Sequence, residues 1–189
     1  MRLFVAIELP EEVKAALVAA QEPLRRGDPP VKWVAAGAMH LTLLFLGETD
    51  PGRLPAVGAA MREALADVPA LQLRLGAAGA FPNMRRPSTL WVDVSGDLAA
   101  LEQAQTALAA ALETLGFPRE QRPFRAHLTL GRVRREANPA EQARLGTALA
   151  ALPSPPQLSW QADRVVLFQS ELLREGPRYT ALEAVRFEA

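Results

Sequence analysis

The sequence contains no cysteine, so disulfide bonds and thiolate metal sites are excluded. Only two of its 21 basic residues are lysines, Lys14 and Lys32, and the rest are arginines. The 21 acidic side chains balance the basic ones, and the formal net charge is zero. No long basic tract of the kind that wraps duplex DNA is present. A site for a phosphate or a nucleic acid must therefore arise from a local concentration of positive charge.

Long apolar runs are also missing. The apolar run near the N-terminus is interrupted by Glu8 and is too short for the hydrophobic region of a signal peptide. Alanine-rich segments occur, but none stays apolar for the roughly 20 residues that a membrane-spanning helix needs. No glycine-rich phosphate-binding loop is present, so no ATP site is predicted. We expect a cytoplasmic protein that does not bind membranes.

The chain has only two histidines, and both lie in the same four-residue frame. The frames are His40-Leu41-Thr42-Leu43 and His127-Leu128-Thr129-Leu130. Leucine and threonine favour strands, and residues i and i+2 of a strand point to the same face. Each frame therefore presents an imidazole beside a hydroxyl on one face and buries two leucines on the other.

Hydrophobic periodicity and turn residues predict alternating strands and helices. The expected strands are Leu3–Glu8, Val31–Val34, Leu41–Leu46 (ended by Gly47), Leu71–Leu75, Thr89–Val94, Arg125–Val133, Arg164–Gln169 and Tyr179–Phe187. The expected helices are 10–27, 50–66, 97–115 (capped by Asp97) and 138–152. The expected connections include a loop at 76–87, a turn segment at 153–156 and a turn at Gly176-Pro177.

The spacing of the two frames predicts an internal duplication. The histidines are 87 residues apart (127 − 40), close to half of the 189-residue chain, and a helix is expected after each frame. We expect an α+β protein with pseudo-twofold symmetry, in which two antiparallel sheets form a central cleft and the helices pack outside. No low-complexity linker divides the halves. Residues 1–189 are therefore expected to form one compact monomeric domain of two interleaved lobes.

Two histidines that face one phosphate suit acid–base phosphoryl chemistry, because neutral imidazole accepts a proton and imidazolium donates one near pH 7. The two threonine hydroxyls can donate hydrogen bonds to phosphate oxygens, and an arginine can neutralise growing negative charge. Arg125 should share a face with His127. Arg132 should point the other way unless Gly131 forms a bulge. Neither frame has a carboxylate nearby in sequence, so we expect no metal and no cofactor.

The frames and their flanks resemble the two-histidine (2H) phosphoesterase superfamily, in particular its bacterial and archaeal RNA 2',3'-cyclic phosphodiesterases, also called 2'-5' RNA ligases. The likeness extends over nearly the whole chain. Its segments are Arg2–Ile7, Trp33, His40–Gly47, Gly79–Pro82, Leu90–Val92, Arg122–Arg132 and Val165–Leu172. Ala126 stands where many members have proline, and we expect little effect.

The resemblance implies a bilobal fold and metal-free hydrolysis of RNA 2',3'-cyclic phosphate ends to 2'-phosphomonoesters. The reverse reaction would be 2'-5' RNA ligation. Carried over by position, His40 is the proton donor and His127 the proton acceptor, while Thr42, Thr129 and Arg132 hold the phosphate. The two frames are too alike for the residues themselves to separate acid from base.

Aromatic residues near the frames are further candidates for substrate binding. Trp33, Phe45 and Phe81 are expected to contact the nucleotide, and Phe81 is the best candidate to stack on a base. Trp91 and Trp160 are assigned to the core. Two alternatives stay open: a module that binds nucleotides or RNA ends without turnover, and a phosphodiesterase for a small cyclic phosphate or a 2'-5'-linked oligonucleotide.

Overall fold

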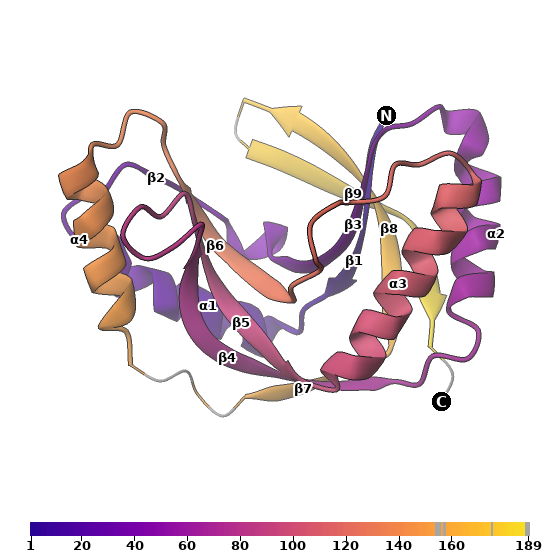
Figure 1. Ribbon diagram of the computed structural model, residues 1–189, viewed down its shortest axis with the longest axis horizontal. Helices are drawn as coiled ribbons and strands as arrows, with labels where there is room; N and C mark the ends of the chain where they lie inside the picture. Colours follow the sequence, from indigo (N-terminus) through magenta and orange to yellow (C-terminus); the bar gives the residue numbers. More distant parts are fainter. Residues whose placement is uncertain (154–155, 157, 175, 188–189) are drawn as a thin grey trace.

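Two antiparallel sheets organise the chain in the computed structural model, which describes residues 1–153, 156, 158–174 and 176–187 (Figure 1). The first sheet has the order β3-β1-β8-β9, and its strands are β1 (Arg2–Glu8), β3 (His40–Glu48), β8 (Arg164–Leu173) and β9 (Gly176–Arg186). The second has the order β2-β6-β5-β4-β7, and its strands are β2 (Val31–Trp33), β4 (Leu71–Phe81), β5 (Thr89–Gly96), β6 (His127–Val133) and β7 (Ser159–Ala162).

Within the part of the chain that the structure describes, four α-helices pack on these sheets (Figure 1). Helices α1 (Glu11–Leu24) and α4 (Pro139–Ala150) lie together against the second sheet. Helices α2 (Leu54–Ala64) and α3 (Leu98–Thr114) lie together against the first. Short 3-10 turns, η1 (Ala36–Ala38) and η2 (Pro51–Arg53), precede β3 and α2. Among the described residues, no helix has both the length and the apolar character needed to cross a bilayer.

The order of the elements agrees with the expected duplication. The series β3-β1-β8-β9 corresponds to β6-β5-β4-β7, with β2 added beside β6. Helix α1 follows β1 of the first sheet but covers the second, and α3 follows β5 of the second sheet but covers the first. The pair of antiparallel sheets is thus confirmed. Neither half of the chain builds a sheet alone, because β8 and β9 join the first sheet while β2 and β4 join the second.

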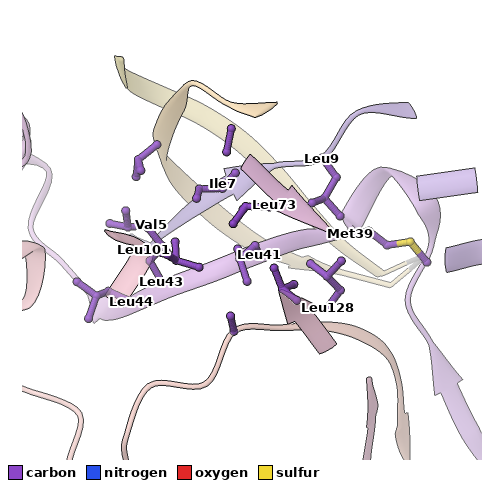
Figure 2. Close-up of a cluster of buried hydrophobic side chains, with 14 of the residues drawn as sticks. Val5, Ile7, Leu9, Met39, Leu41, Leu43, Leu44, Leu73, Leu101 and Leu128 are labelled. Carbon is purple, nitrogen blue, oxygen red and sulfur yellow. The ribbon is translucent and has the colours of Figure 1, made fainter. Parts of the chain in front are cut away.

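The backs of both sheets share one hydrophobic core, part of which is shown in Figure 2. The second residues of the two frames, Leu41 and Leu128, are fully buried in it. Burial of such a side chain stabilises the fold by about 1.5–3 kcal/mol. Because strand side chains alternate, the histidine and threonine of each frame point away from this core. We call the side of each sheet that carries them its motif face.

Strand β4 is longer than expected, because it continues to Phe81 through a segment that the sequence assigned to a loop. The glycines of this segment make room for side chains of β5. A Cβ atom on Gly79 would overlap the ring of Trp91, and one on Gly76 would lie 2.9 Å from Cβ of Asp93. Glycine here reflects close packing within a strand and not a turn.

Smaller corrections concern the ends of elements. Gly176 and Pro177 belong to the edge strand β9, so the β8–β9 turn falls earlier, at Arg174. Gly47 lies inside β3 with a φ of 70° and does not end the strand. The Asp97 carboxylate accepts a hydrogen bond from the Gln72 amide at 2.7 Å instead of capping α3. Strand β7 was not expected, and the expected turn at 153–156 lies partly outside the described residues.

Candidate active site

The two frames begin strands β3 and β6, which contact each other. Their registers are matched. His40 lies opposite Glu8 of β1, and His127 lies opposite Asp93 of β5. Because the leucines of both frames share one core and the strands alternate, both imidazole and threonine pairs lie on the motif faces. The expected alternation within each frame is therefore present.

His40 is half-buried among aromatic rings. Its ring centroid lies 4.8 Å from that of Phe4 and 5.2 Å from that of Tyr179, which meets it edge-on. Phe4, Phe168 and their small neighbours form a separate apolar cluster on this motif face. Burial lowers the pKa of His40 from 6.5 to about 4, although a hydrogen bond with the backbone of Ala38 acts in the opposite direction. His40 is therefore neutral at pH 7 in the free protein.

The His127 ring is fixed by a hydrogen bond and two aromatic neighbours. Its Nδ1 atom lies 2.7 Å from the carbonyl oxygen of Arg125. A carbonyl oxygen only accepts, so Nδ1 carries the hydrogen, and Nε2 of the neutral ring has a free lone pair. Phe81 meets the imidazole edge-on at 5.0 Å, and the Trp91 ring lies at 6.3 Å. This arrangement orients Nε2 as a proton acceptor.

A bulge in β6 places Arg132 on the motif face. Thr129 pairs with Trp91, but Gly131 pairs with Leu90, so one residue of β6 is extra. The alternation is reset, and Arg132 lies opposite Thr89 with its Nη1 atom 3.5 Å from the threonine hydroxyl. The alternation is thus reset, as the prediction required for Arg132, but the extra residue is Leu130, one position before Gly131. Arg132 lies on the same face as Thr129.

The first frame has a bulge at the equivalent place. Thr42 pairs with Ala6, whereas Leu44 pairs with Val5, so Leu43 is the extra residue. Phe45 consequently reaches the motif face, 6.2 Å from the Phe4 ring, and is 64% exposed. The Phe4 ring thus has His40 on one side and Phe45 on another, and the exposed Phe45 ring is available to a ligand.

Arg125 lies just before β6, which begins two residues later than the sequence predicted. Its guanidinium lies 4.4 Å from the Trp91 ring and 3.8 Å from the Asp93 carboxylate. Arg125 therefore shares a face with His127, as expected. It is partly engaged by Asp93 and the indole, and its backbone carbonyl orients the imidazole.

The remaining aromatic candidates are placed differently from one another. Phe81 flanks His127 at the end of β4. Trp33 pairs with Gly131 and packs against the core, away from the motif face, with the Arg25 guanidinium 5.2 Å from its ring. Trp160 is in the core, as expected. Trp91 is also buried, as expected of a core residue, and its ring lies on the motif face beside His127.

Tyr179 is a site residue that the sequence did not single out. It is the only tyrosine in the chain, it lies on β9, and it meets His40 edge-on. Burial raises its pKa, while the positive charges of Arg132 and Arg2 act in the opposite direction. Tyr179 therefore lies near His40 of the first sheet and within the electrostatic range of Arg132 of the second. Its distance in sequence from both frames left no local pattern to reveal it.

Acidic side chains are few around the imidazoles. Within the described part of the chain, no three His, Asp or Glu side chains come together as a set of metal ligands. The two carboxylates opposite the histidines are engaged elsewhere: Glu8 with Arg164 at 3.2 Å, and Asp93 with Arg125. The groups available for chemistry are thus two imidazoles, two hydroxyls and the Arg132 guanidinium.

Comparisons with known proteins identify the family of the chain. A model of the 2'-5' RNA ligase superfamily matches residues 9–172. The RNA 2',3'-cyclic phosphodiesterase of Methanothermobacter thermautotrophicus is 30% identical over 186 residues, which cover 98% of each chain. The RNA 2',3'-cyclic phosphodiesterase of Thermus thermophilus is 37% identical and is matched over 97% of this chain and 88% of its own.

Solved structures show the same fold. TT0787 of Thermus thermophilus superposes with a TM-score of 0.81 at 34% identity, over 99% of this chain and 98% of its own. LigT of E. coli complexed with 3'-AMP superposes with a TM-score of 0.81 at 26% identity, over 100% and 98% of the two chains. With the family model spanning most of its length and such relatives matched nearly end to end, the chain belongs to the 2'-5' RNA ligase superfamily.

Proposed function

We propose that this protein hydrolyses the 2',3'-cyclic phosphate at the end of an RNA to a 2'-phosphomonoester. The observation that carries the proposal is the pair of matched frames, which presents two imidazoles, two threonine hydroxyls and Arg132 on the motif faces of adjoining strands. The relatives named RNA 2',3'-cyclic phosphodiesterase support the substrate. Both frames belong to one catalytic unit in this proposal, because they share one core.

His127 is the proton acceptor in the proposed hydrolysis. Its Nδ1–H is held by the Arg125 carbonyl, so Nε2 takes a proton from the attacking water. The water oxygen bonds to phosphorus while the bond from phosphorus to the 3' oxygen breaks. Thr42 and Thr129 donate hydrogen bonds to the non-bridging oxygens, and Arg132 balances the charge that grows on them.

His40 is the proton donor to the leaving 3' oxygen. In the free protein its burial keeps the ring neutral. The negative charge of a cyclic phosphate favours the imidazolium, so His40 takes up a proton from solvent when the substrate binds and transfers it to the 3' oxygen. The proton that His127 gains from the attacking water returns to solvent after the reaction. A histidine whose pKa is low without substrate is also a strong acid once protonated. In ligation a ribose 5' hydroxyl would take the place of the attacking water: His127 takes its proton, its oxygen bonds to phosphorus, and the bond from phosphorus to the 3' oxygen breaks with a proton from His40. The product is a 2'-5' linkage with a free 3' hydroxyl.

Phe45 and Arg125 are the proposed contacts for the terminal nucleoside. Phe45 offers an exposed aromatic face, and stacking on aromatic side chains is a common way to hold an unpaired base. Arg125 is half-exposed, with its guanidinium 4.4 Å from the Trp91 ring, so part of it is accessible to a ligand. Phe81 acts through His127, which it orients, more than through the base.

No metal enters the proposed reaction. What supports this is the composition of the site: the described residues around the histidines offer no third ligand. Activity should consequently persist in EDTA. A requirement for an added divalent cation would contradict this part of the proposal while leaving the substrate assignment open.

The direct test uses adenosine 2',3'-cyclic phosphate and identifies the product by phosphorus NMR. We expect a 2'-monophosphate, with turnover reduced by about 10²–10⁴-fold in His40→Ala and in His127→Ala. Arg144→Gln, on the exposed outer side of α4, is a matched surface control that should retain full activity. Unchanged nucleotide together with measurable binding would instead support the binding module, and a 3'-monophosphate would reverse the proposed choice of leaving oxygen.

A further inference from the structure

A row of three cationic side chains crosses one end of the motif faces, at the end opposite Glu8 and Asp93. The row consists of Arg2, Arg132 and Lys32, and we call it the cation row. Arg2 is the first residue of β1, whereas Glu8 is the last. Arg132 follows His127 along β6, and His127 is the residue that lies opposite Asp93. The acidic residues and the cation row thus mark opposite ends of the two sheets.

Strand register fixes the position of Arg2. It pairs with Ser170 of β8, and Ser170 pairs with Tyr179 of β9. Residues directly opposite in antiparallel strands share a face, so Arg2 lies on the same face as Tyr179. Phe4 is two residues further along β1 and contacts both Tyr179 and His40. Arg2 therefore lies on the motif face of the first sheet, beyond the ring that packs on His40.

Lys32 completes the row on the second sheet. It pairs directly with Arg132, so the two cations lie side by side on one face. Like charges placed directly opposite each other in a sheet are destabilising. Arg132 and Arg2 in turn both lie close enough to the Tyr179 hydroxyl to act on its ionisation. Tyr179, which shares a face with Arg2, is therefore within the electrostatic range of a cation from each sheet.

The three cations lack acidic partners, in contrast to other arginines of the motif faces. Arg125 is paired with Asp93, and Arg164 with Glu8. Within the described residues, no carboxylate lies within ion-pair distance of any member of the cation row. Glu48 lies opposite Arg2 in the strand register, but its carboxylate is 3.4 Å from the N-terminal amine. An anionic ligand would offset this concentration of charge.

We propose that Arg2 and Lys32 form a subsite for the phosphate that joins the terminal nucleotide to the rest of the RNA. The inference rests on the proposed function, in which Arg132, the middle member of the cation row, holds the cyclic phosphate. The next phosphate of the chain then lies against the outer members of the row, Arg2 and Lys32, and the Tyr179 hydroxyl is available to donate a hydrogen bond. Guanidinium and ammonium groups bind phosphate oxygens by charge-assisted hydrogen bonds. The subsite distinguishes an RNA end from a free cyclic mononucleotide.

The experiment compares two substrates that differ only in this phosphate: adenosine 2',3'-cyclic phosphate and its 5'-phosphorylated form. We expect the wild-type protein to have a kcat/KM about tenfold or more higher for the 5'-phosphorylated form, since a charge-assisted hydrogen bond contributes on that order. The double variant Arg2→Gln/Lys32→Gln should lose this preference and keep its kcat/KM for the unphosphorylated substrate within about twofold. Arg144→Gln serves as the control for loss of positive charge elsewhere.

Binding of the products separates this inference from the proposed function. Isothermal titration with adenosine 2'-monophosphate and adenosine 2',5'-bisphosphate needs no turnover, so it remains informative if the protein proves inactive. We expect the double variant to bind the bisphosphate about tenfold more weakly than the wild type and the monophosphate equally well. The subsite is disproved if the wild type shows no preference for the second phosphate, or if the double variant loses both ligands to the same extent. Circular dichroism establishes that the variant is folded.

Discussion

Arg132 follows the second frame at the position that Phe45 has after the first frame. Each lies three residues beyond the threonine of its frame, and in each strand one extra residue resets the alternation so that the side chain reaches the motif face. The duplicated frames thus place equivalent imidazoles and hydroxyls, but the residue that reaches the motif face after each frame differs: a cation after the second and an aromatic ring after the first. This difference gives a symmetric scaffold two unlike sides, one suited to phosphate and one to a base.

Replacement of Arg132 should lower kcat more than it weakens substrate binding, because its guanidinium stabilises charge that grows in the transition state. We expect Arg132→Gln to lower kcat on adenosine 2',3'-cyclic phosphate by about 10²–10³-fold, the range found when one donor to a developing oxyanion is removed. Arg132→Lys should recover only part of this loss, because an ammonium lacks the planar pair of donors. Arg134→Gln, an exposed neighbour beyond the strand, is the control. Equal kcat with a raised KM would show that the residue only binds the ground state.

Replacement of Phe45 should affect binding more than chemistry. A stacked base contributes about 1–3 kcal/mol, so Phe45→Ala should raise KM about 5–100-fold with a smaller change in kcat. Because the ring is 64% exposed, the melting temperature should hardly change. Leu172→Ala removes a side chain that is 73% exposed, on the β8–β9 hairpin, and provides the matched control. An unchanged KM in Phe45→Ala would place the base elsewhere.

The sequence predicted the imidazole and hydroxyl of each frame because their positions depend only on the two-residue period of a strand. The position of Arg132 depends on a bulge in β6. Gly131, the residue before Arg132, made a bulge plausible from the sequence but did not require one. Phe45 reached the motif face by a bulge with no glycine, at Leu43. Such a bulge leaves no mark in the local pattern, because Leu43 and the next residue, Leu44, are both buried leucines. Local periodicity therefore predicted the symmetric part of the site better than its asymmetric part.

The bulge in β6 can be tested through its glycine. A Cβ atom on Gly131 would lie 2.6 Å from Cγ1 of Val31 and 3.1 Å from the Trp33 ring. We expect Gly131→Ala to lower the free energy of unfolding by about 1–3 kcal/mol, the usual cost of overpacking, and to lower kcat by shifting Arg132. Gly37→Ala adds the same methyl group where no atom lies within 4 Å and should be nearly neutral. Urea denaturation of both variants makes the comparison.

The buried His40 ring should make stability depend on pH. Its pKa is about 4 in the folded protein and 6.5 ordinarily, so between these values the unfolded chain binds more protons. The part of the free energy of unfolding that is linked to His40 is therefore fully present above about pH 6.5. It is lost as the pH falls toward 4, by about 1.4 kcal/mol per pH unit and roughly 3 kcal/mol in all. His40→Gln should lack this contribution. Urea denaturation of wild type and variant at pH 7 and pH 4.5 measures the difference, and parallel losses in both would contradict the assignment.

The contacts that join distant segments could not be predicted from the sequence. Tyr179 meets His40 only because β9 follows β8 into the first sheet at the far end of the chain. Trp91 has the large apolar side chain of a core residue and is indeed buried, but the register of β5 against β6 puts it beside His127. Both residues are placed by strand order and register between segments remote in sequence, and neither quantity is encoded in a local pattern.

The tautomer of His127 provides a last test that does not need turnover. The 2.7 Å contact between its Nδ1 atom and the Arg125 carbonyl requires the hydrogen on Nδ1 of the neutral ring. Nitrogen chemical shifts of the neutral imidazole should report this tautomer in the wild type. Arg125→Pro is unsuitable as a comparison because it alters the backbone, whereas Arg125→Gln keeps the carbonyl and should keep the tautomer while removing the guanidinium. If the hydrogen lies on Nε2 instead, the lone pair faces Arg125, and His127 cannot take a proton from water in the proposed direction.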